Sequence, residues 1–250
     1  MNLDSELPGA VARGEIEVFF QPQIDILSGR MVAVETLSRW RHPFRGLIPP
    51  RDFITDAESS GAIHGLGAFM MAGGCRCAAR WASGRTPLEV AVNVSAVQLS
   101  VPSFFDEVVE TLRTTPLEPH WLTVEVTESR AILDLDVAIT GLERLKSLGV
   151  GVSIDDFGTG FSSLKQVQTL PSTELKIDRS LTQSEAPDSN DRIAEIVKTA
   201  HDLGLRVVAE GVETRLQYDR ARYLGCDRAQ GFLFGHPVPE AEMDELIAAA

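Results

Sequence analysis

Two adjacent carboxylates, Asp155 and Asp156, follow the apolar run 150–154 and precede the Gly-Thr-Gly segment 158–160. The apolar run predicts a buried strand, and the glycines predict that the strand gives way to a turn. Neighbouring carboxylates repel each other unless both face water or a divalent cation binds between them. Taken alone, the pair is better explained as a solvated turn, so a metal site here depends on support from the rest of the chain.

Other apolar runs also end at polar side chains that could bind metals or phosphates. These side chains are Glu35, Asn93, Glu125, Lys176 and Glu210. Each of them alone marks only the point where a strand meets water. In a parallel barrel, however, all carboxyl ends of the strands meet at one face, which is where barrel enzymes have their active sites. We therefore expect these side chains to lie together with the aspartate pair.

Short apolar runs alternate with helical patterns along the chain. Strands are predicted over residues 16–20, 31–34, 88–92, 122–124, 150–154, around 175, and over 207–209 and 228–230. Helices are predicted over residues 51–59, 66–81, 105–112, 135–148, 193–203, 213–224 and 240–250. Such alternation indicates a parallel sheet covered by helices. Eight strands favour a closed (β/α)8 TIM-like barrel, and no early strand is followed by the Gly-x-Gly-x-x-Gly of a dinucleotide-binding fold.

The composition limits the classes of partner. The chain has 250 residues, of which 44% are hydrophobic, and its longest polar stretch, 182–191, is short enough to be a loop. We predict one core without an inter-domain linker. A net charge of −13 argues against a general DNA, RNA or anionic-membrane surface, because such a surface needs clustered Lys and Arg. A small phosphorylated ligand remains compatible if a cation mediates its binding.

The three cysteines, Cys75, Cys77 and Cys226, form an odd set without zinc-ligand spacing, which predicts reduced core thiols. The N-terminus lacks a signal-peptide pattern, and no run reaches the roughly 18 apolar residues of a membrane span. We therefore expect a soluble, cytoplasmic chain.

The predicted ligands at the strand ends are carboxylates and one amide. Hard oxygen ligands of this kind suit Mg²⁺ or Mn²⁺, with two ions about 3.5–4 Å apart sharing a carboxylate. Zinc is the poorer choice because neither Cys nor His belongs to the set.

Residues 35–40, Glu-Thr-Leu-Ser-Arg-Trp, resemble the signature Glu-Ala-Leu-x-Arg-Trp of the EAL-domain family, the bacterial phosphodiesterases specific for cyclic di-GMP. The likeness extends along nearly the whole chain. It includes Gly14-Glu15, Gln21-Pro22, Asn93-Val-Ser95, Glu125-Val-Thr-Glu-Ser129, the segment 155–164, Lys176-Ile-Asp178, Ala209-Glu-Gly-Val-Glu213, Gln230-Gly231 and Pro237.

The resemblance implies a (β/α)8 barrel whose first strand is antiparallel to the others. Residues 1–14 contain Pro8-Gly9 and little periodicity, which predicts an N-terminal lead-in, and residues 15–250 are expected to form the EAL domain. The resemblance implies hydrolysis of cyclic di-GMP to linear pGpG with two Mg²⁺ or Mn²⁺ ions, and inhibition by Ca²⁺. It also implies a homodimer formed near the helix that follows the aspartate pair. Relatives commonly follow sensory or cyclase-like domains, so regulation by domains outside this chain is expected, and whether the chain is a whole protein stays open.

The resemblance assigns roles residue by residue. The implied metal ligands are Glu35, Asn93, Glu125, Asp155 as the bridge, and Asp156 for the second ion. The implied catalytic residues are Lys176, which contacts the attacking water, and Glu210, near the metal-water shell. The implied substrate-binding residues are Gln21, Leu37, Arg39, Glu213 and Gln230, and Glu128 supports the loop after the aspartate pair.

The chain departs from the family pattern at three positions, Phe20, Gln23 and Thr36, none of which removes a ligand. The main alternative function is an inactive EAL domain that binds cyclic di-GMP or a protein partner, but such members usually lack metal ligands that this chain retains. Asp156-Phe-Gly158 also matches a kinase metal motif, although the glycine-rich loop and His-Arg-Asp that a kinase needs are absent. A third alternative is a scaffold barrel with an acidic rim.

Overall fold

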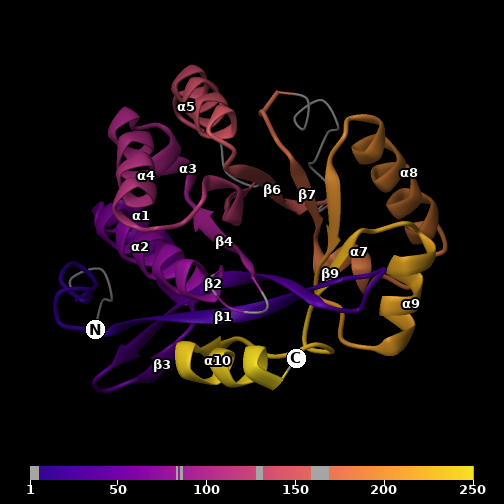
Figure 1. The fold of residues 1–250 in the computed structure, drawn as a ribbon, viewed down its shortest axis with the longest axis horizontal. Coiled ribbons are helices and arrows are strands. Elements are labelled where there is room, and N and C mark those ends of the chain that lie inside the picture. The colour runs from indigo at the N-terminus through magenta and orange to yellow at the C-terminus, as the bar shows by residue number, and fades with distance from the viewer. Residues whose placement is uncertain (1–5, 83, 85–86, 128–131, 159–168, 250) are drawn as a thin grey trace.

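The computed structural model describes residues 6–82, 84, 87–127, 132–158 and 169–249, and its strands form a closed ring surrounded by helices (Figure 1). The ring consists of β1 (Ile16–Asp25), β2 (Met31–His42), β4 (Glu89–Val94), β5 (Leu122–Thr127), β6 (Gly151–Phe157), β7 (Glu174–Ile177), β8 (Arg206–Ala209) and β9 (Arg228–Gln230). Neighbours pair in the order β1-β9-β8-β7-β6-β5-β4-β2, and a β1–β2 pairing closes the ring.

The direction of β1 distinguishes this barrel from an all-parallel one. β1 pairs antiparallel with both β2 and β9, whereas the other pairs around the ring are parallel. This confirms the eight-stranded barrel and the antiparallel first strand.

Several strands run further than the apolar pattern predicted. The prediction that the second strand ends at Glu35 is wrong, because β2 continues to His42. Its outer half pairs with β1, as in Ile16 with Trp40, and with the short strand β3 (Gly46–Ile48). A further short strand, β10 (Val238–Pro239), pairs with β1. Backbone pairing continues through polar residues of β2 such as Ser38 and Arg41, so hydrophobicity alone does not mark where pairing stops.

The helices surround the ring, with α1–α5 on the left and α7–α9 on the right of Figure 1. They are α1 (Ile54–Ser60), α2 (Ala62–Ala82), α3 (Ala96–Leu99), α4 (Pro102–Thr114), α5 (Leu135–Ser147), α7 (Arg179–Thr182), α8 (Ser189–Asp202), α9 (Arg215–Tyr223) and α10 (Glu240–Ala249), with 3-10 helices η2 (Pro50–Asp52) and η3 (Pro119–Trp121). The predicted helix-ending glycines, Gly149 and Gly204, have positive φ angles of 100° and 74°. The α4 helix begins earlier than predicted because Pro102 occupies its first turn.

The core lies between the ring and its helices in two clusters. One joins α2, α4 and α5 to β1, β2, β4, β5 and β6, and the other joins α8 and α9 to β6–β9. Leu7 and Ala10, within the predicted lead-in, are buried and belong to the first cluster. All three cysteines are buried and unpaired, as predicted.

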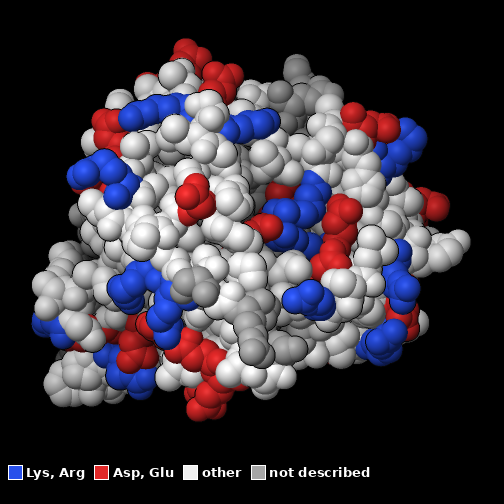
Figure 2. All heavy atoms as spheres, in the orientation of Figure 1, with Lys and Arg blue, Asp and Glu red and all other residues white. Residues whose placement is uncertain are grey.

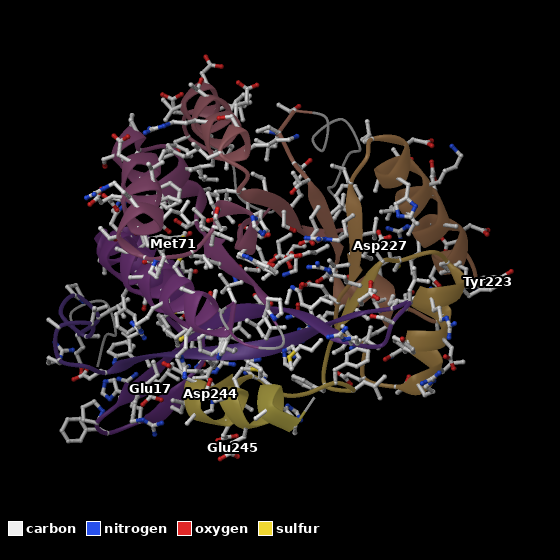
Figure 3. All side chains as sticks on the ribbon, viewed as in Figure 1. Glu17, Met71, Tyr223, Asp227, Asp244 and Glu245 are labelled. Atoms are coloured by element: carbon white, nitrogen blue, oxygen red, sulfur yellow. The ribbon has the colours of Figure 1, made fainter. Side chains whose placement is uncertain are left out.

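The C-terminal helix is fastened to the end of α2. Asp244, labelled on α10 in Figure 3, accepts hydrogen bonds from Arg80 and from the indole N–H of Trp81. Within the described part of the chain, no helix is both long and apolar enough to cross a membrane. On the described part of the face in Figure 2, basic side chains lie in small groups beside acidic ones and form no broad positive area.

Candidate active site

Lys176 lies at the centre of the candidate site, fully buried within β7. Its Nζ is 2.7 Å from Glu210 Oε1, 2.9 Å from Glu125 Oε1, 3.2 Å from Asp155 Oδ1 and 3.6 Å from Glu35 Oε2. These carboxylates come from β2, β5, β6 and the residue after β8, so the barrel brings together side chains far apart in sequence. The ammonium does not reach solvent, which excludes the reading of Lys176 as a lysine that merely extends along the barrel surface to water.

Two amide side chains also hold Glu35 by hydrogen bonds. Asn93 Nδ2 donates to Glu35 Oε1 at 2.6 Å, and Gln230 Nε2 donates to Glu35 Oε2 at 2.6 Å. Gln230 also donates to Gln21 Oε1 at 3.1 Å and accepts from Gln23 Nε2 at 2.9 Å. Gln23 was not predicted as a site residue, although it lies two positions after Gln21 on the same face of β1.

The cluster places four carboxyl groups around one ammonium, and the pKa shifts follow from burial and from this excess of acids. Burial alone would raise the pKa of Glu35, but Lys176 and the amide hydrogen bonds bring it below its ordinary value. For Glu125 and Glu210, burial and the neighbouring carboxylates outweigh Lys176 and raise the pKa well above its ordinary value. The pKa of Asp155 is raised as well, chiefly by burial. Burial would lower the pKa of Lys176, but the surrounding acids raise it well above its ordinary value.

Asp156 has an unusual backbone conformation, with a φ of +59°. The pairing of β6 with β7 shifts register between Ile154 and Phe157, which places Asp156 in the irregularity. Burial, together with the nearby Asp155 and Asp178, raises the pKa of Asp156 to about 6. Left-handed backbone at a non-glycine residue is uncommon and is frequent at functional sites.

The residues present fit a divalent cation. Carboxylate oxygens of Asp155, Asp156 and Glu210 all lie within 4.8 Å of one another. Both carboxylate oxygens of Glu125 and Oδ1 of Asp155 are buried and, within the described residues, make no hydrogen bond of normal geometry, although Lys176 lies at ion-pair distance. Unsatisfied buried carboxylate oxygens are costly in a finished core but suitable as ligands for hard cations.

A cavity of about 510 Å³ opens over this cluster at the carboxyl ends of the strands. Its lining includes the predicted substrate-binding residues Gln21, Leu37, Glu213 and Gln230. It also includes the acids Glu35, Asp155, Asp156 and Glu210. Six lining residues were not predicted as site residues, namely Arg51, Asp178, Arg179, Gly211, Gly231 and Phe232. Asp178 and Arg179 directly follow β7, so their position just after a predicted strand could have indicated them.

Two predicted residues are not part of this arrangement as described. The Arg39 guanidinium lies 5.4 Å from the centroid of the Phe19 ring and donates to the Ser38 carbonyl at 2.9 Å, outside the cavity lining. Glu128 lies outside the described residues, as do residues 159–168 of the segment after the aspartate pair.

A barrel with charged side chains converging in a cavity at the carboxyl ends of its strands has the arrangement that (β/α)8 enzymes use for catalysis. The family model of the EAL domain matches residues 4–237, and the chain belongs to the EAL domain family.

Named relatives and solved structures agree with this membership. The chain is 41% identical to the bifunctional diguanylate cyclase/cyclic di-GMP phosphodiesterase MucR of Pseudomonas aeruginosa, over 99% of this chain and 37% of MucR. It is 39% identical to the cyclic di-GMP phosphodiesterase NbdA of the same organism, over 100% of this chain and 32% of NbdA. The structure of the PaMucR phosphodiesterase in complex with c-di-GMP matches with a TM-score of 0.90 and 40% identity, over 97% of this chain and 100% of that one. The chain thus spans about a third of the length of these two curated relatives.

Proposed function

We propose that this chain hydrolyses one phosphodiester bond of cyclic di-GMP and releases linear pGpG. The carrying observation is the cluster of Glu35, Glu125, Asp155 and Glu210 around Lys176, of which Glu35, Asp155 and Glu210 line a cavity of about 510 Å³. A cluster with this charge surplus suits a reaction that needs added cations and a phosphate. The likeness to relatives named cyclic di-GMP phosphodiesterases indicates cyclic di-GMP as the substrate.

Two Mg²⁺ or Mn²⁺ ions would be held by the acids and the neighbouring amide. Glu35, Asn93, Glu125 and Asp155 would hold one ion, and Asp155 would bridge to a second ion held by Asp156. When bound, the ions would lower the pKa of a water molecule to near neutrality and stabilise the charge that develops on the phosphate.

Side chains of this chain would then position the reacting groups. A water oxygen attacks the phosphorus, the bond from phosphorus to the 3′ oxygen breaks, and that oxygen leaves with a proton as a hydroxyl. Lys176 supplies a fixed positive charge and N–H donors beside the attacking water. Glu210, 2.7 Å from Lys176, orients that ammonium.

The remaining assignments stay predictions. Gln21, Leu37, Arg39, Glu213 and Gln230 would hold the nucleotide, and Glu128 would support the loop after the aspartate pair. The homodimer, the cytoplasmic location and the division into a lead-in and one domain also stay predictions.

The second candidate is an inactive EAL domain that binds cyclic di-GMP as a receptor. Both functions predict binding, so turnover separates them: purified chain is incubated with cyclic di-GMP and Mg²⁺ or Mn²⁺, and the products are separated by chromatography. Conversion to pGpG that stops in excess chelator supports the phosphodiesterase, whereas binding without conversion supports the receptor.

A further inference from the structure

Gln23 is a buried amide inside the barrel that the proposed mechanism does not use. It lies on β1, is 1% exposed and is not among the described residues that line the cavity. Its Nε2 donates to Gln230 Oε1 at 2.9 Å. Burying an amide is costly unless its hydrogen bonds are satisfied, so an apolar residue of similar size would be the simpler choice for packing alone. The contact with Gln230 is therefore where a role for this side chain lies.

The pairing of β1 with its two neighbours brings this contact next to Glu35. Gln23 is the backbone partner of Gln230 on β9, and Gln21 is the backbone partner of Glu35 on β2. Side chains two residues apart on a strand lie on the same face, so Gln21 and Gln23 both reach Gln230. Gln23, Gln230 and Gln21 are called the amide chain below.

The hydrogen bonds of the amide chain have one direction throughout. Gln21 Nε2 donates to the Gly235 carbonyl at 3.2 Å, and Gln21 Oε1 accepts from Gln230 Nε2 at 3.1 Å. Gln230 Nε2 also donates to Glu35 Oε2 at 2.6 Å. Carbonyl and carboxylate oxygens only accept, so the NH2 group of Gln230 must face Gln21 and Glu35. Its carbonyl oxygen then faces Gln23, which supplies the donor.

This donor keeps the Gln230 amide in the orientation that Glu35 needs. Without the N–H of Gln23, the buried carbonyl oxygen of Gln230 would lose its hydrogen bond, and rotation of the amide toward another partner would become favourable. Rotation would withdraw an N–H from Glu35 Oε2. Because Asn93 Nδ2 holds the other oxygen, Glu35 Oε1, at 2.6 Å, Gln230 decides whether both ends of the carboxylate are fixed.

We propose that Gln23 is a positioning residue of the metal site, which holds Gln230 so that Glu35 keeps the orientation in which it binds a cation. This inference rests on the proposed function and adds to it a residue outside the cavity. Removing a partner that orients a metal ligand typically changes metal affinity or activity by about 10-fold to 100-fold. Gln23 acts one step further from the ion than Gln230, so the lower end of this range applies.

The test compares Gln23→Met with Thr36→Val. Methionine retains the length of the side chain and removes its strong hydrogen-bonding groups. Thr36 is also 1% exposed, and its hydroxyl donates to the Ala91 carbonyl at 3.0 Å, outside the amide chain. Thr36→Val therefore controls for the loss of a buried hydrogen bond. Melting temperature, kcat and KM for cyclic di-GMP are each measured as a function of Mg²⁺ concentration.

For Gln23→Met, we expect the Mg²⁺ concentration at half of the maximal rise in melting temperature to increase by about tenfold. The concentration at half-maximal kcat should increase by the same factor. At saturating Mg²⁺, kcat and KM should return to within about threefold of the unaltered chain, because Gln23 contacts neither the ions nor the substrate. Thr36→Val should leave the Mg²⁺ dependence within about twofold, since its hydrogen bond does not orient Glu35.

A double variant tests whether Gln23 acts through Gln230. If it does, Gln23→Met combined with Gln230→Met should have a Mg²⁺ dependence within about twofold of Gln230→Met alone, because the partner is already lost. A further increase of about tenfold in the double variant would overturn the proposed route. If Gln23→Met does not fold, Gln23→Asn, which keeps the amide but is one methylene shorter, has the same expected results.

Each outcome separates this inference from the proposed function. A shifted Mg²⁺ dependence in Gln23→Met, without one in Thr36→Val, supports positioning even if cyclic di-GMP is not hydrolysed. An unshifted dependence, in a chain that hydrolyses cyclic di-GMP, overturns positioning and leaves the proposed function standing. If Mg²⁺ changes neither the melting temperature nor the turnover of the unaltered chain, both are overturned.

Discussion

The two ends of the barrel each contain a cluster of charged side chains, and the clusters differ in charge balance. At the amino end, the first residues of four strands, Glu89, Glu174, Arg206 and Arg228, form ion pairs of 2.6–2.9 Å, with two acids matched by two guanidinium groups. At the carboxyl end, Lys176 is the one cation that the described residues place at ion-pair distance from the four carboxylates of Glu35, Glu125, Asp155 and Glu210.

The pKa shifts follow this difference. Burial alone would raise the pKa of Glu89, but Arg228 and Arg206 lower it below its ordinary value. Burial and like charge instead raise the pKa of Glu125 and Glu210. The balanced cluster has its charges paired within the fold, whereas the unbalanced one would be completed by the cations of the proposed function. On the proposed function, the barrel separates stability at one end from catalysis at the other.

The largest effect is expected from Asp155→Asn, which removes the proposed bridge between the ions. Turnover should fall by at least about three decades, because both ions lose a shared ligand. Thermal unfolding of the metal-free variant should occur at the same temperature as for the unaltered chain or higher, because one surplus negative charge is gone. Near-native turnover in folded Asp155→Asn would contradict the two-metal assignment, and Glu128→Gln should lose less activity.

Lys176→Ala removes the only cation described at the centre of the carboxyl-end cluster. We expect kcat to fall by about two to four decades with cyclic di-GMP binding within roughly tenfold, because the ammonium acts mainly in the transition state. Steady-state kinetics and titration in Ca²⁺ measure the two quantities, with circular dichroism to verify folding.

The geometry adds a second expectation for Lys176→Ala. Four carboxylates without Lys176 repel one another more strongly, so Mg²⁺ should raise the melting temperature of this variant more than that of the unaltered chain. Normal turnover would contradict a catalytic role, and joint loss of binding and turnover would make Lys176 a substrate clamp instead.

Glu89→Gln tests the cluster of ion pairs at the amino end of the barrel. Because Arg206 and Arg228 lose a charged partner, the free energy of unfolding should fall by about 3 kcal/mol. The kcat should stay within about threefold, since the substitution lies at the opposite end of the barrel. Urea unfolding and steady-state kinetics measure the two, and a large loss of kcat with little loss of stability would reverse the assignment of the two ends.

A smaller effect concerns pH. Since the pKa of Glu89 is lowered in the folded chain, its contribution to stability is fully present above its unfolded pKa and is lost as pH falls through the folded value. The difference in unfolding free energy between Glu89→Gln and the unaltered chain should therefore shrink from about pH 7 to about pH 3. A difference that stays constant over this range would show that the ion pairs do not cause it.

The sequence predicted the carboxyl-end site better than the amino-end cluster. Apolar runs that lead into Glu125, Asp155 and Lys176 combine a strand pattern with a polar side chain, and parallel strands bring such ends together. Glu89 and Arg228 are the second and the first residue of their predicted strands, where a charged residue is indistinguishable from an ordinary strand boundary. Their pairing depends on which strands become neighbours, and local patterns do not contain this information.

Some features of the fold and the site could be recognised only in the structure. The direction of β1 came only from the resemblance to a family, because a period of two residues is the same in parallel and antiparallel strands. The contacts of Lys176 with four carboxylates likewise depend on the register of the whole ring.

The central claim is that the carboxyl-end cluster is a phosphodiesterase site completed by divalent cations. The most direct test is chromatography of cyclic di-GMP incubated with purified chain in Mg²⁺, Mn²⁺ or Ca²⁺, and after dialysis into excess chelator. We expect conversion to pGpG in Mg²⁺ or Mn²⁺, strong loss of turnover in Ca²⁺, whose larger size and looser geometry misplace the attacking water, and none in chelator. Undiminished turnover in chelator, or no turnover with any metal despite binding, would contradict this account.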